Sequence, residues 1–235
     1  IILFGCSFTY GSFLKDNETF SYKLSNATNR AVYNRGVEGG GLAQMLYFLR
    51  DENFYNQIKQ PPEYVIYTYI TNHQKRLNTN MFQNPLFLRG YNFQYKLKNG
   101  KLIIKQNLPD FIYDSFIIKK IYSYFDKINN KPSQKNVQKR FILTNTILIE
   151  CKNLLEQRYG KIKFIILDYN YEYNTEENDL PDLWNTLEKE GFIIIHTKDL
   201  IGRDFSIEET TVDKFHPGKQ VWDILVPELI KKLDI

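Results

Sequence analysis

The chain has 235 residues, of which 43% are hydrophobic and 15% aromatic. This composition provides enough apolar surface for a sizeable core and excludes global disorder. Its 31 basic and 27 acidic residues give a net charge of +4. That balance is too even to indicate a nucleic-acid partner, and the chain carries no basic stripe or nucleic-acid-binding motif.

The cysteine content and hydropathy exclude further classes. Two cysteines, Cys6 and Cys151, exclude a disulfide framework and a cysteine-rich zinc site. No run approaches the roughly 18 apolar residues that a membrane-spanning helix needs. The chain begins without Met and inside an expected strand, so we expect its N-terminus to be incomplete. The sequence therefore leaves localisation and oligomeric state open.

Short apolar runs alternate with longer segments of helical periodicity along most of the chain. In chain order, the sequence predicts strands at 1–4, 31–33, 64–70, 162–167 and 192–195, and helices at 20–28, 42–58, 137–159, 183–190 and 221–233. Alternating strands and helices predict an α/β fold with a parallel sheet covered by helices on both faces. At this length we expect a single domain over 1–235.

Residues 78–132 break this alternation and are rich in Asn, Tyr, Phe and Lys. The turn Asn99-Gly100 between 91–97 and 102–106 predicts a β-hairpin, and 112–128 has helical spacing. We interpret the segment as an insertion after the third strand, either a lid or substrate wall or a surface decoration. Its aromatic residues either stack on sugar rings, cover acyl chains or pack against neighbours: Phe82, Phe87, Tyr91, Phe93 and Tyr95.

The first strand ends just before Ser7, and the carboxyl edge of an open α/β sheet is where such folds keep their sites. Ser7 is therefore a candidate nucleophile, which needs a base. Of the three histidines, His216 has Asp213 three residues before it, so a carboxylate can orient Nδ1 while Nε2 takes the Ser7 proton. His73 and His196 are the alternative bases, and His196 has no carboxylate close before it.

Other residues at the same edge have more than one interpretation. Cys6 is a rival nucleophile, but neighbouring residues leaving a strand point in different directions, which favours Cys6 as a buried filler. Gly39 and Asn72 follow the second and third strands and are either oxyanion donors or ordinary turn residues. The acidic loop at 172–179 lacks the ligand spacing of a metal site, so we expect neither metal nor cofactor.

Four segments in order resemble the motif blocks of the SGNH or GDSL hydrolases. Residues 5–11 resemble the block Gly-Asp-Ser-x-x-x-Gly, with Cys6 in place of the Asp. Residues 34–39 resemble the block of an Asn followed by a turn ending in Gly, and 213–216 match the block Asp-x-x-His. Residues 70–73 approximate Gly-x-Asn-Asp, with Ile70 and His73 replacing its first and last residues.

The resemblance implies a flavodoxin-like three-layer α/β/α sandwich. It also implies Ser7 as nucleophile, His216 as base oriented by Asp213, and an oxyanion hole made by the N–H groups of Ser7 and Gly39 and the side chain of Asn72. His73 and Arg76 are left as substrate-binding or structural residues. The implied activity is serine esterase action on small acyl esters, such as O-acetyl groups on glycans. The alternatives are acyl transfer to a glycan hydroxyl, or a silent module that binds carbohydrate or a partner.

Overall fold

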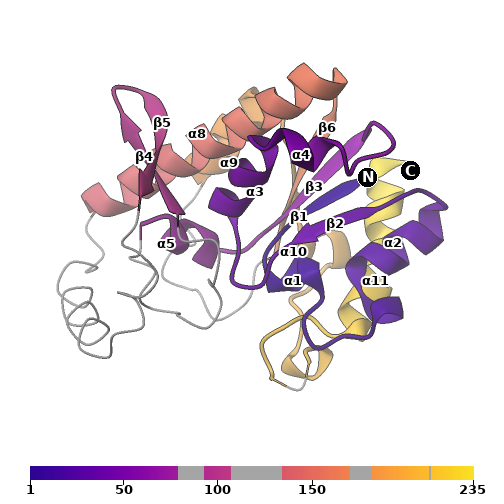
Figure 1. Ribbon diagram of the computed structural model, residues 1–235. Coiled ribbons are helices and arrows are strands. Elements are labelled where there is room, and N and C mark those ends of the chain that lie inside the picture. Colours follow the sequence, from indigo (N-terminus) through magenta and orange to yellow (C-terminus); the bar gives the residue numbers. More distant parts are fainter. Residues whose placement is uncertain (79–92, 107–133, 170–180, 212) are drawn as a thin grey trace, which may run out of the picture.

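The computed structural model describes residues 1–78, 93–106, 134–169, 181–211 and 213–235. The expected helix at 112–128 and the acidic loop at 172–179 lie outside these ranges, as do Phe82, Phe87 and Tyr91. Five parallel strands form the central sheet: β1 (Ile2–Gly5), β2 (Tyr33–Gly36), β3 (Tyr64–Tyr69), β6 (Lys163–Asp168) and β7 (Ile193–His196) (Figure 1). Their order, β2-β1-β3-β6-β7, is the flavodoxin-like one and confirms the predicted fold.

Successive residues of the central strands pack into two separate cores. Along β1, Ile2 and Phe4 belong to one core cluster, while Leu3 belongs to the other. The same alternation separates Ile165 from Ile166 in β6. Strands buried on both faces need apolar residues at every position, which explains why these segments are continuous hydrophobic runs.

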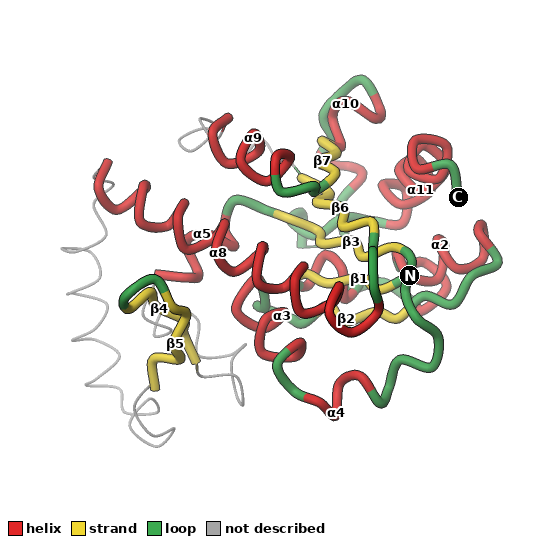
Figure 2. The backbone as a smooth tube through the Cα atoms, turned by 90° about the horizontal axis from the view of Figure 1, so that it is seen from above, coloured by secondary structure: helices red, strands yellow, loops and turns green. Residues whose placement is uncertain are grey.

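Helices cover both faces of the sheet, as Figure 2 shows. One face carries α3 (Leu42–Leu49), α4 (Glu52–Tyr55), α8 (Gln134–Tyr159) and α9 (Pro181–Lys189), and the other carries α2 (Phe20–Thr28) and α11 (Lys219–Leu233). On the second face, the rings of Phe20 and Trp222 stack 4.7 Å apart and join α2 to α11. The predicted three-layer sandwich is therefore confirmed.

Most predicted elements begin or end one to three residues from their bounds in the structure, and two of the differences have a local cause. The expected helix at 42–58 is two helices, because Asp51 interrupts it and caps α4 by accepting the N–H of Asn53 at 3.0 Å. The expected strand at 31–33 is β2 at Tyr33–Gly36, paired with β1 up to Gly5 and Gly36. Its polar residues are tolerated because β2 lies at the edge of the sheet and is only half-buried.

Short helices follow three strand ends and were not predicted. These are α1 (Ser7–Tyr10) after β1, α5 (Asn72–Asn78) after β3 and α10 (Thr197–Ile201) after β7. One or two turns are too short to produce a readable helical period. Short 3₁₀ turns also occur at Asp16–Glu18 and Ile207–Glu209.

The expected hairpin is present as β4 (Phe93–Lys98) and β5 (Lys101–Gln106). Asn99 and Gly100 have φ angles of 50° and 73°, as a tight two-residue turn of type I′ requires. Tyr95 is only 2% exposed and lies under the guanidinium of Arg50, so it packs in the core and is not available to stack on a sugar.

The expected insertion lies between α5 and α8, and its inclusion in one domain over 1–235 stays a prediction. Within the described ranges, no helix is long and apolar enough to cross a membrane.

The packing of α8 can be tested with two isoleucines on the same helix. Ile147 is fully buried in the core, whereas Ile142 is 51% exposed. We expect Ile147→Ala to lower the free energy of unfolding by about 2 to 5 kcal/mol, because it leaves a cavity. Ile142→Ala should change it by no more than about 0.5 kcal/mol. Urea unfolding of both variants measures the difference, and equal losses would contradict this packing.

Candidate active site

The chain leaves β1 in a conformation that only glycine allows. Gly5 has a φ of 153°, and a Cβ there would lie 2.1 Å from Thr9 Oγ1. This close approach lets α1 begin directly after the strand, at the carboxyl edge of the sheet (Figure 1). Ser7 is the first residue of α1, so its N–H has no partner within the helix and can serve a ligand. Cys6 is fully buried in the core, as expected for a filler.

The two ends of the chain meet at Ser7. His216 Nε2 lies 2.7 Å from Ser7 Oγ, across 209 residues of sequence. The other ring nitrogen, Nδ1, lies 2.5 Å from Asp213 Oδ2. The sequence predicted these three residues as one site, and the structure brings them together in a single hydrogen-bonded chain.

Asp213 is held as an anion by the loop that carries it. Thr211 Oγ1 donates to its Oδ1 at 2.5 Å, and the N–H groups of Phe215 and His216 donate to the same oxygen at 3.1 Å. Burial by itself would raise the pKa of Asp213, but these hydrogen bonds outweigh it and lower the pKa to about 2. With Asp213 ionised, Nδ1 of His216 carries the proton and Nε2 is left to accept one from Ser7.

The candidate oxyanion donors follow the ends of three adjacent strands. Ser7 follows β1, Gly39 follows β2, and Asn72 is the half-buried first residue of α5 after β3. Gly39 has a φ of 66° in a turn closed by the Gly40 N–H, which donates to the Val37 carbonyl at 2.8 Å. Neighbouring parallel strands end at the same edge, so these groups lie at the same carboxyl edge of the sheet. The convergence of the three donors on one oxygen stays a prediction.

Asn34 joins α1, which follows β1, to the end of β2 through two hydrogen bonds. Its Nδ2 donates to the Thr9 carbonyl at 2.8 Å, and its Oδ1 accepts the Gly36 N–H at 2.9 Å. Gly36 itself lies so close to α1 that a Cβ there would be 2.3 Å from Tyr10 N. The second motif block therefore positions α1 relative to β2, a role that its Asn in the sequence did not reveal.

His73 and Arg76 lie beneath the glycine turn. His73 is fully buried, and its ring is in contact distance of Gly41, where a Cβ would be 3.3 Å from His73 Cδ2. Arg76 Nη1 donates to the carbonyl of Gly40. Of the two roles that the sequence left open for these residues, these contacts favour the structural one.

Burial makes His73 a weak base. Burial, with a smaller contribution from Arg76, lowers its pKa well below the usual range, so the ring is neutral. Burial raises the pKa of Tyr67 well above its usual value, and Tyr67 Oη therefore stays protonated and donates to His73 Nδ1 at 2.7 Å. Because Nδ1 accepts this hydrogen bond, Nε2 carries the ring proton, and neither nitrogen of His73 is left to take a proton from Ser7. The proton transfer is therefore left to His216.

His196 has a carboxylate partner that the sequence did not indicate. Its Nδ1 lies 2.8 Å from Asp168 Oδ2 at the ends of β7 and β6. The hydrogen bond with Asp168 raises the pKa of His196, while burial raises that of Asp168 against the opposing effect of His196. Strand pairing opposes the two residues directly, although 28 residues separate them in sequence.

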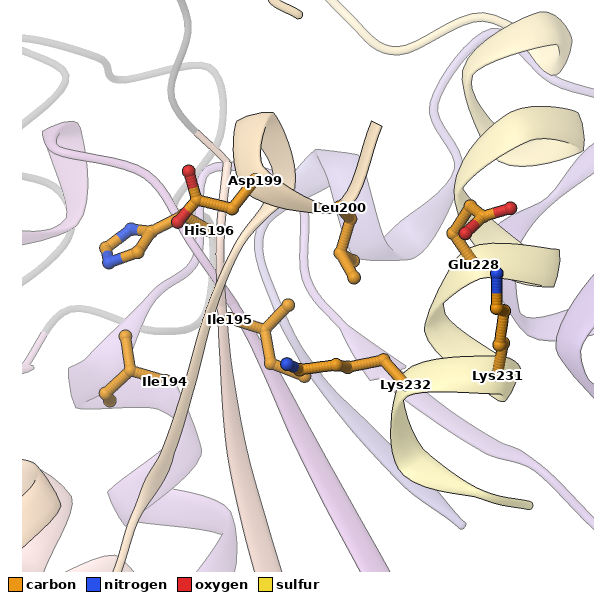
Figure 3. Close-up of a pocket in the computed structure, with 8 residues that line it drawn as sticks. All are labelled: Ile194, Ile195, His196, Asp199, Leu200, Glu228, Lys231 and Lys232. Carbon is orange, nitrogen blue, oxygen red and sulfur yellow. The ribbon is translucent and has the colours of Figure 1, made fainter. Parts of the chain in front are cut away.

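His196 also lines a cavity of about 430 Å³ between β7, α10 and α11 (Figure 3). Its remaining lining residues are Ile194, Ile195, Asp199, Leu200, Glu228, Lys231 and Lys232. Neither Ser7 nor His216 lines this cavity. In the described part of the chain, the histidine that contacts Ser7 is His216, as the spacing to Asp213 predicted.

Comparisons with known proteins bear on the fold. No protein-family model and no curated protein matches the chain. Among solved structures, it is similar to a member of the lipolytic protein G-D-S-L family from Veillonella parvula, with 13% identity and a TM-score of 0.51 over 98% of this chain and 95% of that one. The chain therefore has the fold of the GDSL lipolytic proteins, as the resemblance in its motifs implied.

Two carbohydrate esterases are also similar. An acetyl xylan esterase from the rumen bacterium Butyrivibrio proteoclasticus has 11% identity and a TM-score of 0.58 over 99% of this chain. A carbohydrate esterase family 2 enzyme with a carbohydrate binding domain, from Corynascus thermopiles (Myceliophthora fergusii), has 10% identity and a TM-score of 0.56 over all of this chain. This chain covers only 62% and 66% of their respective lengths.

The pairing of His196 with Asp168 can be tested by titration. The raised pKa means that protonated His196 contributes stability fully below its ordinary value of about 6.5, and that this contribution is lost as the pH rises through the raised pKa. NMR titration of the imidazole should give a lower pKa in Asp168→Asn than in the wild type. Asp199→Asn is the control and should shift the pKa less, because Asp199 acts only through its charge. An unchanged titration in Asp168→Asn would contradict the pairing.

Proposed function

We propose that this protein is a serine esterase that cleaves small acyl esters through an acyl-enzyme. The observation that carries the proposal is the hydrogen-bonded chain from Ser7 through His216 to Asp213. The same order of nucleophile, base and orienting carboxylate activates serine in unrelated hydrolases. The GDSL-type fold adds support, since the similar structures include esterases.

In the proposed reaction, Ser7 Oγ attacks the ester carbonyl carbon and its proton passes to His216 Nε2. The carbonyl oxygen becomes an oxyanion, for which the N–H groups of Ser7 and Gly39 and the Asn72 amide are the proposed donors. When the tetrahedral intermediate collapses, the bond to the alcohol oxygen breaks and that oxygen takes the proton from His216. Water then attacks the acyl-enzyme with His216 again as base, which releases the acid and regenerates Ser7.

For the substrate we propose O-acetyl esters of glycans, and the two carbohydrate esterases of similar fold support this class. Acyl transfer to a sugar hydroxyl would use the same acyl-enzyme. It would differ only in that the sugar hydroxyl, in place of water, attacks the acyl-enzyme. A silent binding module would not need Ser7 hydrogen-bonded to a histidine that a carboxylate orients, so the geometry favours an enzyme. The proposal includes no metal or cofactor step.

The nucleophile can be identified with two neighbouring substitutions. We expect Ser7→Ala to lower the turnover of p-nitrophenyl acetate by at least about 10⁴-fold, because removing a triad nucleophile leaves only binding and oxyanion stabilisation. The same variant should lose labelling by a fluorophosphonate probe. Cys6→Ala is the matched control and should keep most of both signals. An inactive Cys6→Ala beside an active Ser7→Ala would show that the thiol is the nucleophile.

The role of Asn72 can be separated from a role in folding. If its amide donates to the oxyanion, Asn72→Ala should lower kcat by roughly a hundredfold or more, with a smaller change in KM. Thermal unfolding measured beside turnover detects a purely structural loss. Asn26→Ala, at an exposed position of α2, is the control and should leave both quantities unchanged. Wild-type kcat in Asn72→Ala would remove this residue from the oxyanion hole.

A further inference from the structure

Three phenyl rings surround the imidazole of His216. The ring centroids of Phe8, Phe13 and Phe215 lie 5.4, 5.3 and 5.3 Å from that of His216. Phe8 is buried and supports Phe215 at 5.6 Å, edge to face. Phe13 is 65% exposed and Phe215 is 38% exposed, so both present apolar surface to solvent beside the proposed base. Large apolar side chains gathered on a surface are typical of binding sites.

The loops that carry these two rings contain residues in the left-handed region. Phe13 has a φ of 67°, and Lys214, directly before Phe215, has a φ of 59°. This conformation is rare and costly for a bulky residue, and it tends to occur where function requires it. Because Phe13 is mostly exposed, burial of its ring in the core does not offset the strain. The strain and the exposure therefore point together to a ligand that the ring contacts.

The chemistry of the reaction decides which part of the ester lies there. His216 must give its proton to the alcohol oxygen, which requires that oxygen to come within hydrogen-bond distance of Nε2. The carbonyl oxygen is directed instead toward the proposed donors Ser7, Gly39 and Asn72. Groups that pack around the imidazole therefore flank the alcohol part of the substrate and not the acyl part.

We propose that Phe13 and Phe215 form a subsite for the alcohol part of the ester, and that it prefers a bulky alcohol with an apolar face. This inference rests on the proposed esterase function. The C–H face of a sugar ring meets the requirement, as does a saturated carbocycle. The two rings bind this group while the acyl group is transferred to Ser7, and the alcohol leaves from the subsite with the proton from His216.

The test varies the alcohol while the acyl group stays constant. Ethyl acetate and cyclohexylmethyl acetate give the same acetyl-enzyme, so a difference in kcat/KM reports the alcohol part. We expect Phe13→Ala and Phe215→Ala each to lower the ratio of kcat/KM for the bulky over the small ester by about tenfold or more. Tyr22→Ala, which removes a 50% exposed ring on α2, is the control and should leave the ratio unchanged.

A second series distinguishes the acyl part from the alcohol part. The ratio of kcat/KM for ethyl butyrate over ethyl acetate should be the same in Phe13→Ala as in the wild type. A change in that ratio, with the alcohol ratio unchanged, would place the acyl chain at Phe13 and overturn the proposal. If the wild type cleaves both acetates and neither ratio changes, the subsite is wrong while the esterase function stands. If fluorophosphonate does not label the wild type and no ester is cleaved, both proposals fail.

The strain at Phe13 has a separate readout. Phe13→Gly and Phe13→Ala both remove the ring, but glycine adopts a positive φ without steric cost. We therefore expect Phe13→Gly to unfold at a higher temperature than Phe13→Ala, with the same loss of preference for the bulky alcohol. An equal or lower melting temperature for Phe13→Gly would show that the loop is not strained and would remove that support for the subsite.

Discussion

The placement of β1 between two parallel neighbours is the constraint on which the rest of the structure depends. β1 pairs with β2 on one side and β3 on the other, so the carboxyl ends of all three open at one edge. Parallel neighbours require crossover connections, and the helices in these connections bury both faces of the sheet. Groups that follow each strand are thereby brought to one edge by backbone pairing. Gly5 and Gly36 allow the close approach of α1 that this arrangement needs.

Two aspartate–histidine pairs, one in the loop before α11 and one at the ends of β6 and β7, illustrate how the surroundings decide what a pair can do. Asp213 accepts hydrogen bonds from its own loop, and they lower its pKa despite partial burial. Asp168 is almost completely buried, and burial raises its pKa against the effect of His196. In the first pair, Nε2 of the histidine lies 2.7 Å from the hydroxyl of Ser7, whereas the histidine of the second pair lines a separate cavity. Similar residue types therefore form a candidate catalytic relay in one place and a structural pair in the other.

The motif block at 70–73, which departs most from the family pattern, contains a histidine with a structural role. His73 replaces a polar residue, yet it is fully buried, neutral and hydrogen-bonded to Tyr67. Together with Arg76 it lies against the turn at 39–41, whose backbone carries a proposed donor. These residues support the geometry of the turn, whereas the strained Phe13 is exposed and contacts the ring of His216.

The sequence alone determined the sheet, its layers and the residues that meet at Ser7. Continuous apolar runs indicate strands buried on both faces, and the short spacing of Asp213 and His216 defines a local pair that needs no tertiary information. The sequence did not predict the short helices α1, α5 and α10, because one or two turns have no readable period. It also left the break at Asp51 unrecognised, because apolar residues continue on both sides of it.

Apart from the meeting of Ser7 and His216, the contacts between residues far apart in the chain were decided only by the tertiary structure. Asp168 meets His196 because parallel pairing opposes the ends of β6 and β7, and no local spacing encodes that register. The sequence left His73 as a substrate-binding or a structural residue. Its burial against the glycine turn favours the structural role. The rings around His216 likewise come from both ends of the chain. Local patterns determine elements and short-range pairs, whereas burial and long-range partners depend on which elements the fold places together.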